Sequence, residues 1–259
     1  MHWTERMRYS VGFSTATSNK IYSGTSEVAN PTGEETEFQQ WALNLHFQQD
    51  AQRRWSLTIP TIQIEARNNT GVLEKVSGLG DFALVHGWRP QPNGPWEILV
   101  GLELPTGEEL DTPAPGVIPP SLLQPGSGTW DPLVGVSWTK VTGDFSHTLN
   151  GVGLFPLGSS DADLDPGNLA QAMYRVGWNV NSSAEVSLGF EGIFRTKDKL
   201  LGTTLANTSS MVYALRPGFR WAFEDVTLFV GARFPLAYDV DATQIAPGNL
   251  FEFWLGYGG

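Results

Sequence analysis

The stretch VTLFVGARFPL, from Val226 to Leu236, places an arginine inside a run that otherwise suits a buried β-strand. Successive side chains of a strand point to opposite faces, so the stretch divides into two rows. One row is entirely apolar, whereas the other is mixed and carries Arg233: Val226, Leu228, Val230, Ala232, Phe234 and Leu236 against Thr227, Phe229, Gly231, Arg233 and Pro235. What each face contacts therefore decides the fold.

The composition favours strands and turns over helices. The 259 residues include 29 Gly, 17 Pro, 10 Trp and 14 Phe, and only 17% are charged. The chain has no Cys, which excludes disulfides, thiolate metal sites and covalent c-type haem. We expect no cofactor, and the net charge of −11 argues against a nucleic-acid partner.

The same alternation recurs along the chain. We count about twelve segments of about ten residues, the length that a tilted transmembrane strand needs. The first is expected from roughly Trp3 to Thr15. In the third, the apolar phase changes between Ile59 and Ile62, which predicts a bulge at Pro60.

The connections between these segments alternate in length. Short ones such as QDAQRR, VTGD and AFED alternate with long ones such as residues 16–37, GEELDTPAPGVIPPSLLQPGSG and DVDATQIAPG. In an up-and-down sheet, long and short connections lie at opposite ends. This is typical of outer-membrane barrels, and it places both termini on the short-turn side.

Aromatic residues on the apolar face gather toward both ends of the segments, as they do at membrane–water interfaces. A soluble sandwich or barrel also buries aromatics, but about twelve strands enclose a lumen too wide to fill easily with side chains. Trp3, Trp55, Trp88, Trp96, Trp138, Trp178 and Trp221 lie near the short turns, and Phe155, Tyr174, Phe194, Tyr213 and Phe251 toward the long loops. We therefore expect residues 1–259 to form one domain, an all-β transmembrane antiparallel up-and-down β-barrel.

This fold predicts a location in the outer membrane of a Gram-negative type of cell, with the lipid bilayer as a partner. No segment approaches the ~18 consecutive apolar residues of a membrane-spanning helix. The start, MHWTERMRYS, lacks the apolar region of a signal peptide. This start is expected either of a cytosolic chain or of a mature form whose leader has been removed.

The mixed faces predict a wet lumen for Arg233 and for other charged side chains. Strand order places Glu185 and Glu191 beside Arg216 and Arg220, and Glu252 between Arg233 and the first-strand arginines. Such residues either set solute preference or form a salt-bridged filling that holds the barrel round. As lumen wall and solute-contacting residues we expect Arg6, Arg8, Glu191, Arg216, Arg220, Arg233 and Glu252.

Four segments between Gly78 and Gly151 carry a family resemblance. GLGDFALVHGWRP, LVGLELPTG, LQPGSGTWDPLVGVSWTK and GDFSHTLNG occur in this order. They resemble the transporter family of "Putative MetA-pathway of phenol degradation" proteins, in which a Gly-Asp strand start, a Leu-Pro-Thr-Gly end and a Pro-Gly-Ser-Gly…Asp-Pro segment recur. Here the matching residues are Gly80 and Asp81, Leu104 to Gly107, Pro125 to Gly128, and Asp131 and Pro132.

The resemblance implies an outer-membrane barrel that takes up small, often aromatic or apolar compounds passively. Between the second and third motifs, a long Pro-rich loop carries apolar residues such as Val117 and Leu122. This loop, from Thr112 to Pro125, is expected either to fold over the mouth as an apolar landing site or to be a solvated external loop.

Three other functions compete with transport. A lipid hydrolase needs a nucleophile and its base on one face, but Ser146 and His147 are consecutive on one strand and point apart. Asp161, Asp163 and Asp165 alternate like part of a calcium loop but lack its glycine and terminal glutamate. A barrel that serves as a sleeve for a partner protein remains open. We expect a channel, no enzyme and no metal site.

Overall fold

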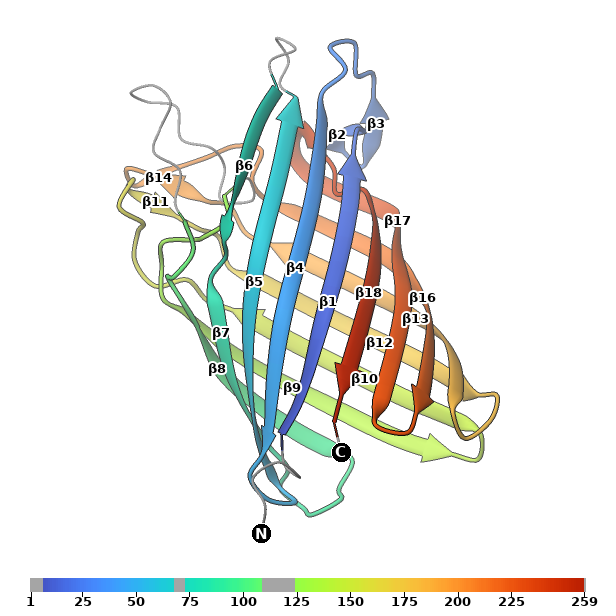
Figure 1. Ribbon diagram of the computed structural model, residues 1–259. Helices are drawn as coiled ribbons and strands as arrows, with labels where there is room; N and C mark the ends of the chain where they lie inside the picture. The colour runs from blue at the N-terminus through green and yellow to red at the C-terminus, as the bar shows by residue number, and fades with distance from the viewer. Residues whose placement is uncertain (1–6, 68–72, 109–123, 259) are drawn as a thin grey trace.

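The computed structural model describes residues 7–67, 73–108 and 124–258 (Figure 1). In these ranges, fifteen strands form one sheet and three short strands form a second. No helix in this part of the chain is long and apolar enough to cross a membrane.

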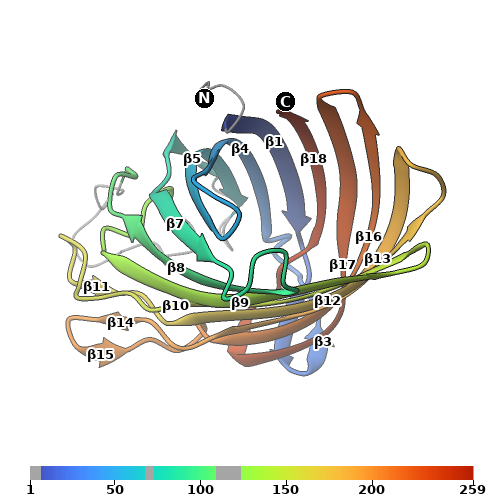
Figure 2. The same ribbon diagram turned by 90° about the horizontal axis from the view of Figure 1, so that it is seen from below.

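Twelve strands of the larger sheet, counted over the described residues, close into an antiparallel barrel that Figure 2 shows from below. The first and last strands close the ring, with partners from Tyr9–Tyr257 to Thr17–Asn249. The predicted up-and-down barrel of about twelve strands is confirmed. Its strands are β1 (Met7–Ser18), β4 (Glu35–Gln48), β5 (Arg53–Arg67), β7 (Phe82–Trp88), β8 (Trp96–Leu104), β9 (Asp131–Thr142), β10 (Phe145–Leu154), β12 (Leu169–Asn179), β13 (Ala184–Arg195), β16 (Ser210–Phe223), β17 (Val226–Ile245) and β18 (Asn249–Tyr257).

The two faces of these strands meet different surroundings. On the outside, large apolar side chains are exposed, for example Trp41 at 56% and Leu188 at 55%. On the inside, carboxylates are buried, with Glu191 at 0% and Glu185 at 3% exposure. A water-soluble protein distributes these residue types the other way round. The outer surface is therefore suited to lipid and the interior to polar groups.

The apolar row of β17 faces outward, and the row that carries Arg233 faces the interior of the barrel. Val226, Val230 and Phe234 are exposed on the outer face. Gly231, on the opposite face, is paired with Gly218 of β16 and with Glu252 of β18. Arg233 shares the face of Gly231, so it is half-buried inside the barrel.

The two ends of the barrel differ as the connection lengths predict. The connections 49–52, 89–95, 143–144, 180–183 and 224–225 are short, and both chain ends lie on their side (Figure 1). The opposite end carries the long connections and six further strands. These are β2 (Ile21–Gly24), β3 (Ser26–Val28), β6 (Leu73–Leu79), β11 (Leu164–Asp165), β14 (Lys199–Leu200) and β15 (Thr203–Thr204).

Exposed aromatic side chains lie toward both ends of the outer face, as the sequence predicts. Trp88, Trp96 and Trp178 are 41%, 49% and 50% exposed near the short turns. Phe194 and Phe251, nearer the long loops, are 45% and 52% exposed. Two bands of amphipathic rings are what a barrel needs at the two membrane interfaces.

Three local predictions are wrong or fall outside the described residues. β5 itself has no bulge at Pro60, because the β4–β5 register runs unbroken from Glu35–Arg67 to Gln48–Arg54. The irregularity lies in the partner on its other side, since Thr58 pairs with Ala83 and Thr61 with Leu79, which leaves one extra residue opposite Pro60. The change of apolar phase instead marks apolar residues in the interior. Most of the predicted loop DVDATQIAPG is strand, because the end of β17 pairs with β2. Trp3, in the first predicted strand, is not described, and that strand is seen from Met7.

Candidate solute pathway

Six of the seven predicted lumen residues are described, and all six fall on inward-facing strand positions. They are Arg8 on β1, Glu191 on β13, Arg216 and Arg220 on β16, Arg233 on β17 and Glu252 on β18. The seventh, Arg6, lies outside the described residues. The barrel therefore brings together side chains from both halves of the sequence.

Arg216 is the centre of an ion network on β13 to β18. Its Nη1 donates to Glu191 Oε1 at 2.9 Å, and its Nη2 donates to Glu252. The first pair joins neighbouring strands, as expected. The second differs from the expectation, since among the described residues Glu252 forms an ion pair with neither Arg233 nor Arg8. Arg216 reaches across β17 at Gly231, which has no side chain in the way.

A second network lies nearer the short turns. Glu185 on β13 accepts hydrogen bonds from Arg175 Nη1 at 2.6 Å and from Ser146 Oγ at 2.7 Å. Arg220 Nε lies 3.9 Å from the same carboxylate, and 43% of its side chain is exposed. Because Arg220 faces inward, that exposed surface belongs to the lumen, which is therefore accessible to water at this level.

On the other side of the barrel, Arg54 of β5 forms a two-pronged ion pair with Glu97 of β8. Arg54 Nε donates to Oε1 at 2.6 Å and Nη2 donates to Oε2 at 3.1 Å. Sequence reasoning missed Arg54 because it assigned QDAQRR to a turn, whereas β5 begins at Arg53. The sequence did contain a signal: because Trp55 was placed on the outer face, the preceding residue, Arg54, falls on the inner face.

Arg233 differs from Arg216 because Glu191 and Glu252 attract its charge only from a distance, without a direct contact. Among the described residues it forms no ion pair, and its buried Nε has no hydrogen-bond partner. We use the name charged wall for seven charged residues that face inward on β12 to β18: Arg175, Glu185, Glu191, Arg216, Arg220, Arg233 and Glu252.

Two aromatic side chains also point inward, beside the charged wall. The ring of Phe229 covers Gly218 and Gly231, since a Cβ at either glycine would come within 2.8 Å of it. Trp254, on β18 opposite Phe229, covers Gly12 of β1, where a Cβ would lie 2.2 Å from the indole. The glycines thus create the space for these rings. Sequence reasoning overlooked Trp254, although it falls in the polar row of its strand.

The inward face of β5 to β10 carries a group of apolar side chains in its middle, although Glu103 of β8 and Asp131 of β9 face each other inward toward the long loops. Ile64 is 3% exposed. Close approaches to glycines confirm the inward direction of others, since a Cβ at Gly135 would lie 3.1 Å from Val152 and 3.5 Å from Leu99. We call this surface the apolar wall: Pro60, Ile62, Ile64, Val85, Leu99, Leu133 and Val152.

The three sequence motifs of the family resemblance meet at the long-loop end of the apolar wall. The Asp81 carboxylate accepts hydrogen bonds from the backbone N–H of Gly107 at 2.8 Å and of Ser127 at 2.6 Å. Gly107 and Gly126 approach so closely that a Cβ on Gly107 would lie 2.5 Å from the Gly126 Cα. Asp81 therefore ties together both ends of the Pro-rich loop. Most of that loop, including Val117 and Leu122, lies outside the described residues.

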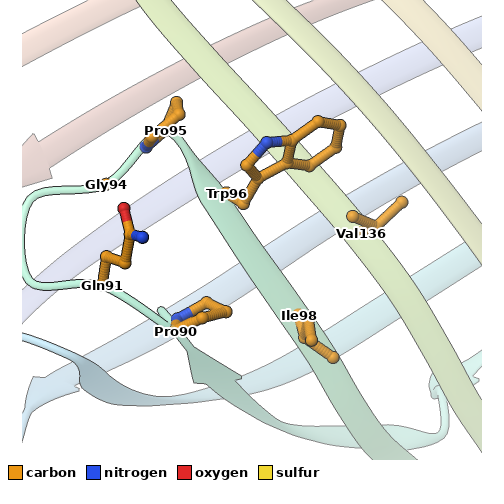
Figure 3. Close-up of a pocket in the computed structure, with 7 residues that line it drawn as sticks. All are labelled: Pro90, Gln91, Gly94, Pro95, Trp96, Ile98 and Val136. Atoms are coloured by element: carbon orange, nitrogen blue, oxygen red, sulfur yellow. The ribbon is translucent and has the colours of Figure 1, made fainter.

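Two cavities lie at the short-turn end. One, of about 680 Å³, is lined by three arginines and one carboxylate, so it carries an excess of positive charge; these residues are Arg8, Arg54, Arg89 and Asp50. The other, of about 350 Å³, lies between the β7–β8 turn and the outward residues Trp96 and Val136 (Figure 3). Only the first is next to the inward-facing residues and can belong to a passage.

The residues of the hydrolase alternative lie on opposite faces. Ser146 Oγ is bonded to Glu185 inside, whereas His147 Nδ1 is 2.9 Å from the Tyr174 hydroxyl on the outside. They cannot act as nucleophile and base for each other. Within the described ranges, no group of three or more His, Asp or Glu side chains could hold a metal ion, and this includes Asp161, Asp163 and Asp165.

A sequence profile of the family described as "Putative MetA-pathway of phenol degradation" matches residues 17–254. No curated protein sequence matches the chain.

Solved structures of outer-membrane barrels share the fold at low sequence identity. An outer membrane channel from Pseudomonas putida F1 superimposes with a TM-score of 0.80 at 14% identity, over 98% of this chain and 95% of that chain. The β domain of the Bordetella autotransporter BrkA gives 0.57 at 10% identity, over 98% and 100%. The CymD monoaromatic hydrocarbon channel gives 0.54 at 8% identity, over 98% and 89%.

Proposed function

The chain belongs to the family described as "Putative MetA-pathway of phenol degradation", and on this premise we propose that it is a passive channel of the Gram-negative outer membrane. The solutes are small organic molecules, including aromatic and apolar ones. Residues 1–259 act as one domain, without cofactor and without catalysis.

The inside-out barrel carries this proposal. Side chains on the inner face retain accessible surface, for example 31% for Arg54 and 27% for Arg175. A soluble protein gains nothing from such a polar interior behind an apolar exterior. In a bilayer, the same arrangement gives a hydrated route across the hydrocarbon layer.

The apolar wall supports the choice of solute. A channel for sugars or ions needs only polar lining, whereas here Val85, Leu99 and Leu133 offer apolar surface beside the charged wall. Burial of a few methylene groups of a solute against such a surface stabilises it by about 0.8 kcal/mol each. The family description, which refers to phenol, agrees with this class of solute.

The proposal is tested by uptake of radiolabelled benzyl alcohol into cells whose outer membrane has intact lipopolysaccharide. Cells that produce the protein should accumulate the solute several-fold faster than matched cells without it, while uptake of a large hydrophilic sugar stays unchanged. Equal benzyl alcohol uptake in both strains would contradict the proposal.

Co-purification from the same membranes addresses the sleeve alternative. A channel is expected to be isolated without a stoichiometric partner protein. A partner that occupies the barrel and abolishes uptake when bound would favour the sleeve function instead.

A further inference from the structure

We propose that Arg233, Phe229 and Trp254 form a binding site in the lumen for a single-ring aromatic carboxylate. Arg233 binds the carboxylate, and the two rings contact the aromatic body. The inference rests on the proposed channel function, which it deepens by assigning a charge to a preferred solute.

Arg233 is available to an anion because its neighbours are committed elsewhere. Arg216 holds one oxygen of Glu191 and one of Glu252. The second oxygen of Glu191 is free, but Glu191 is completely buried and so lies out of reach of a solute. Arg233 keeps accessible surface inside the barrel and forms no ion pair among the described residues. A planar guanidinium in this state is suited to a bidentate carboxylate.

The unpaired charge of Arg233 favours an anion over a neutral solute at this position. The Nε atom is buried and out of reach of a solute, so an anion binds through the accessible part of the guanidinium. A neutral apolar solute offers that guanidinium no acceptor, whereas a carboxylate offers two oxygens.

The aromatic rings lie at a suitable distance from the charge. Phe229 leans onto Gly231, which is the inward position next to Arg233, about 7 Å away along the strand. Trp254 is in register with Phe229 on β18, its indole covers Gly12 of β1, and its Nε1 donates to Glu252 Oε2 at 3.4 Å, which places the ring at the edge of the same part of the lumen. A benzoate ion can therefore contact a ring with its body while its carboxylate reaches Arg233. Offset or edge contacts between aromatic rings add to the stability of such a complex.

Electrostatics beyond the site favour release toward the short turns. The cavity at that end is lined by Arg8, Asp50, Arg54 and Arg89, and because Arg54 is paired with Glu97, its excess positive charge comes from Arg8 and Arg89. At the other end, the carboxylates of Asp81 and Asp131 are buried and are satisfied by backbone N–H groups and by Thr129. An anion that leaves Arg233 thus meets positive potential on the short-turn side.

The test compares benzoate with its neutral analogue benzamide on purified protein in planar bilayers. The readout is the concentration of each solute that halves the single-channel current. We expect benzoate to act at about tenfold lower concentration than benzamide, which is the effect of one charged hydrogen-bonded contact.

Variants assign this preference to individual side chains. R233Q should raise the half-blocking concentration of benzoate about tenfold and leave that of benzamide unchanged. For R233K, the half-blocking concentration of benzoate should lie between those of the unmodified protein and R233Q, because lysine keeps the charge but not the planar, forked guanidinium. F229L should raise the half-blocking concentrations of both solutes. R53Q, which removes an exposed arginine at a short turn, is the matched control and should change neither.

Equal action of benzoate and benzamide on the unmodified protein would overturn the inference, as would an unchanged benzoate value in R233Q. Unchanged benzamide block shows that R233Q still forms the channel. The benzyl alcohol experiment separates the two proposals: if that uptake persists while benzoate has no advantage, the channel stands and the site is wrong. If benzyl alcohol uptake is absent, the channel itself is wrong.

Discussion

The charged wall and the apolar wall belong to one ring, share one strand period and have the same kind of outer face, yet their inner faces differ. Leu188 on β13 and Ile98 on β8 are both exposed to the outside, at 55% and 40%. Inside, β13 carries Glu191 at its middle whereas β8 carries Leu99, with the carboxylates of Glu97 and Glu103 nearer the ends of β8. Lipid dictates the outer face of every strand in the same way, so the specific chemistry of this barrel is confined to its interior.

The two walls are also held by different forces. Charged groups such as Glu191 and Arg216 lose hydration inside the barrel and are stable only as hydrogen-bonded pairs. The apolar wall needs no such pairing, but its rim depends on Asp81. Substitutions in the charged wall should therefore destabilise the protein through lost ion pairs, and substitutions at the rim of the apolar wall through lost hydrogen bonds.

The largest effect is expected from loss of the shared cation of the charged wall. R216M leaves Glu191 and Glu252 without their partner, and it should lower the free energy of unfolding by about 4 kcal/mol, as breaking a buried ion pair does. Urea unfolding in detergent micelles measures this. The matched control R53M removes an exposed arginine and should change stability by less than about 0.5 kcal/mol. Equal effects would mean that the charged wall is not held by its ion network.

The next largest effect concerns the rim of the apolar wall. D81A removes the acceptor of two backbone N–H groups, and it should cost about 3 kcal/mol in the same assay. The exposed Asp161 provides the control D161A, which should be neutral. A neutral D81A would show that the meeting of the three motifs does not stabilise the rim.

A smaller effect is expected where Trp254 adjoins the charged wall. A Cβ at Gly12 would lie 2.2 Å from its indole, so G12A should displace the ring and cost about 2 kcal/mol. At Gly256 the nearest atom would be 3.6 Å from an added Cβ, which is ordinary contact. G256A should therefore be close to neutral. If both variants behave alike, Trp254 does not occupy the interior as described.

The smallest effect is functional rather than structural. L99N places a polar amide in the apolar wall and should slow benzyl alcohol uptake about threefold, because one apolar contact with the solute is lost. L99M preserves the apolar surface and should retain normal uptake. Faster uptake in L99N would indicate that the solute follows the charged wall instead.

The sequence predicts those parts of the barrel that follow from strand period and strand order. Period two separates Leu188 from Glu191 without any knowledge of the fold, and adjacency of two strands is enough to join Glu191 to Arg216. These are local consequences of an up-and-down sheet.

The remaining features depend on side-chain reach and on room, which the alternation pattern does not encode. Glu252 binds Arg216 rather than Arg233 because the long arginine side chain crosses a glycine on the strand between them. Trp254 faces inward because Gly12 on the next strand leaves room for it. The end of β17 is strand because it pairs with β2, whose short segment gives little signal.

Two consecutive residues of β16 test the orientation of the strand faces most directly. Phe219 is 41% exposed and the Arg220 side chain 43%, so the two differ in what they contact rather than in how much. The chain has no Cys, so F219C and R220C can each carry a single nitroxide label in liposomes. We predict that dissolved oxygen relaxes the label at position 219, and that a water-soluble nickel complex relaxes the label at position 220. The reverse pattern, or equal access of the nickel complex to both, would contradict a lipid-facing exterior around a hydrated lumen.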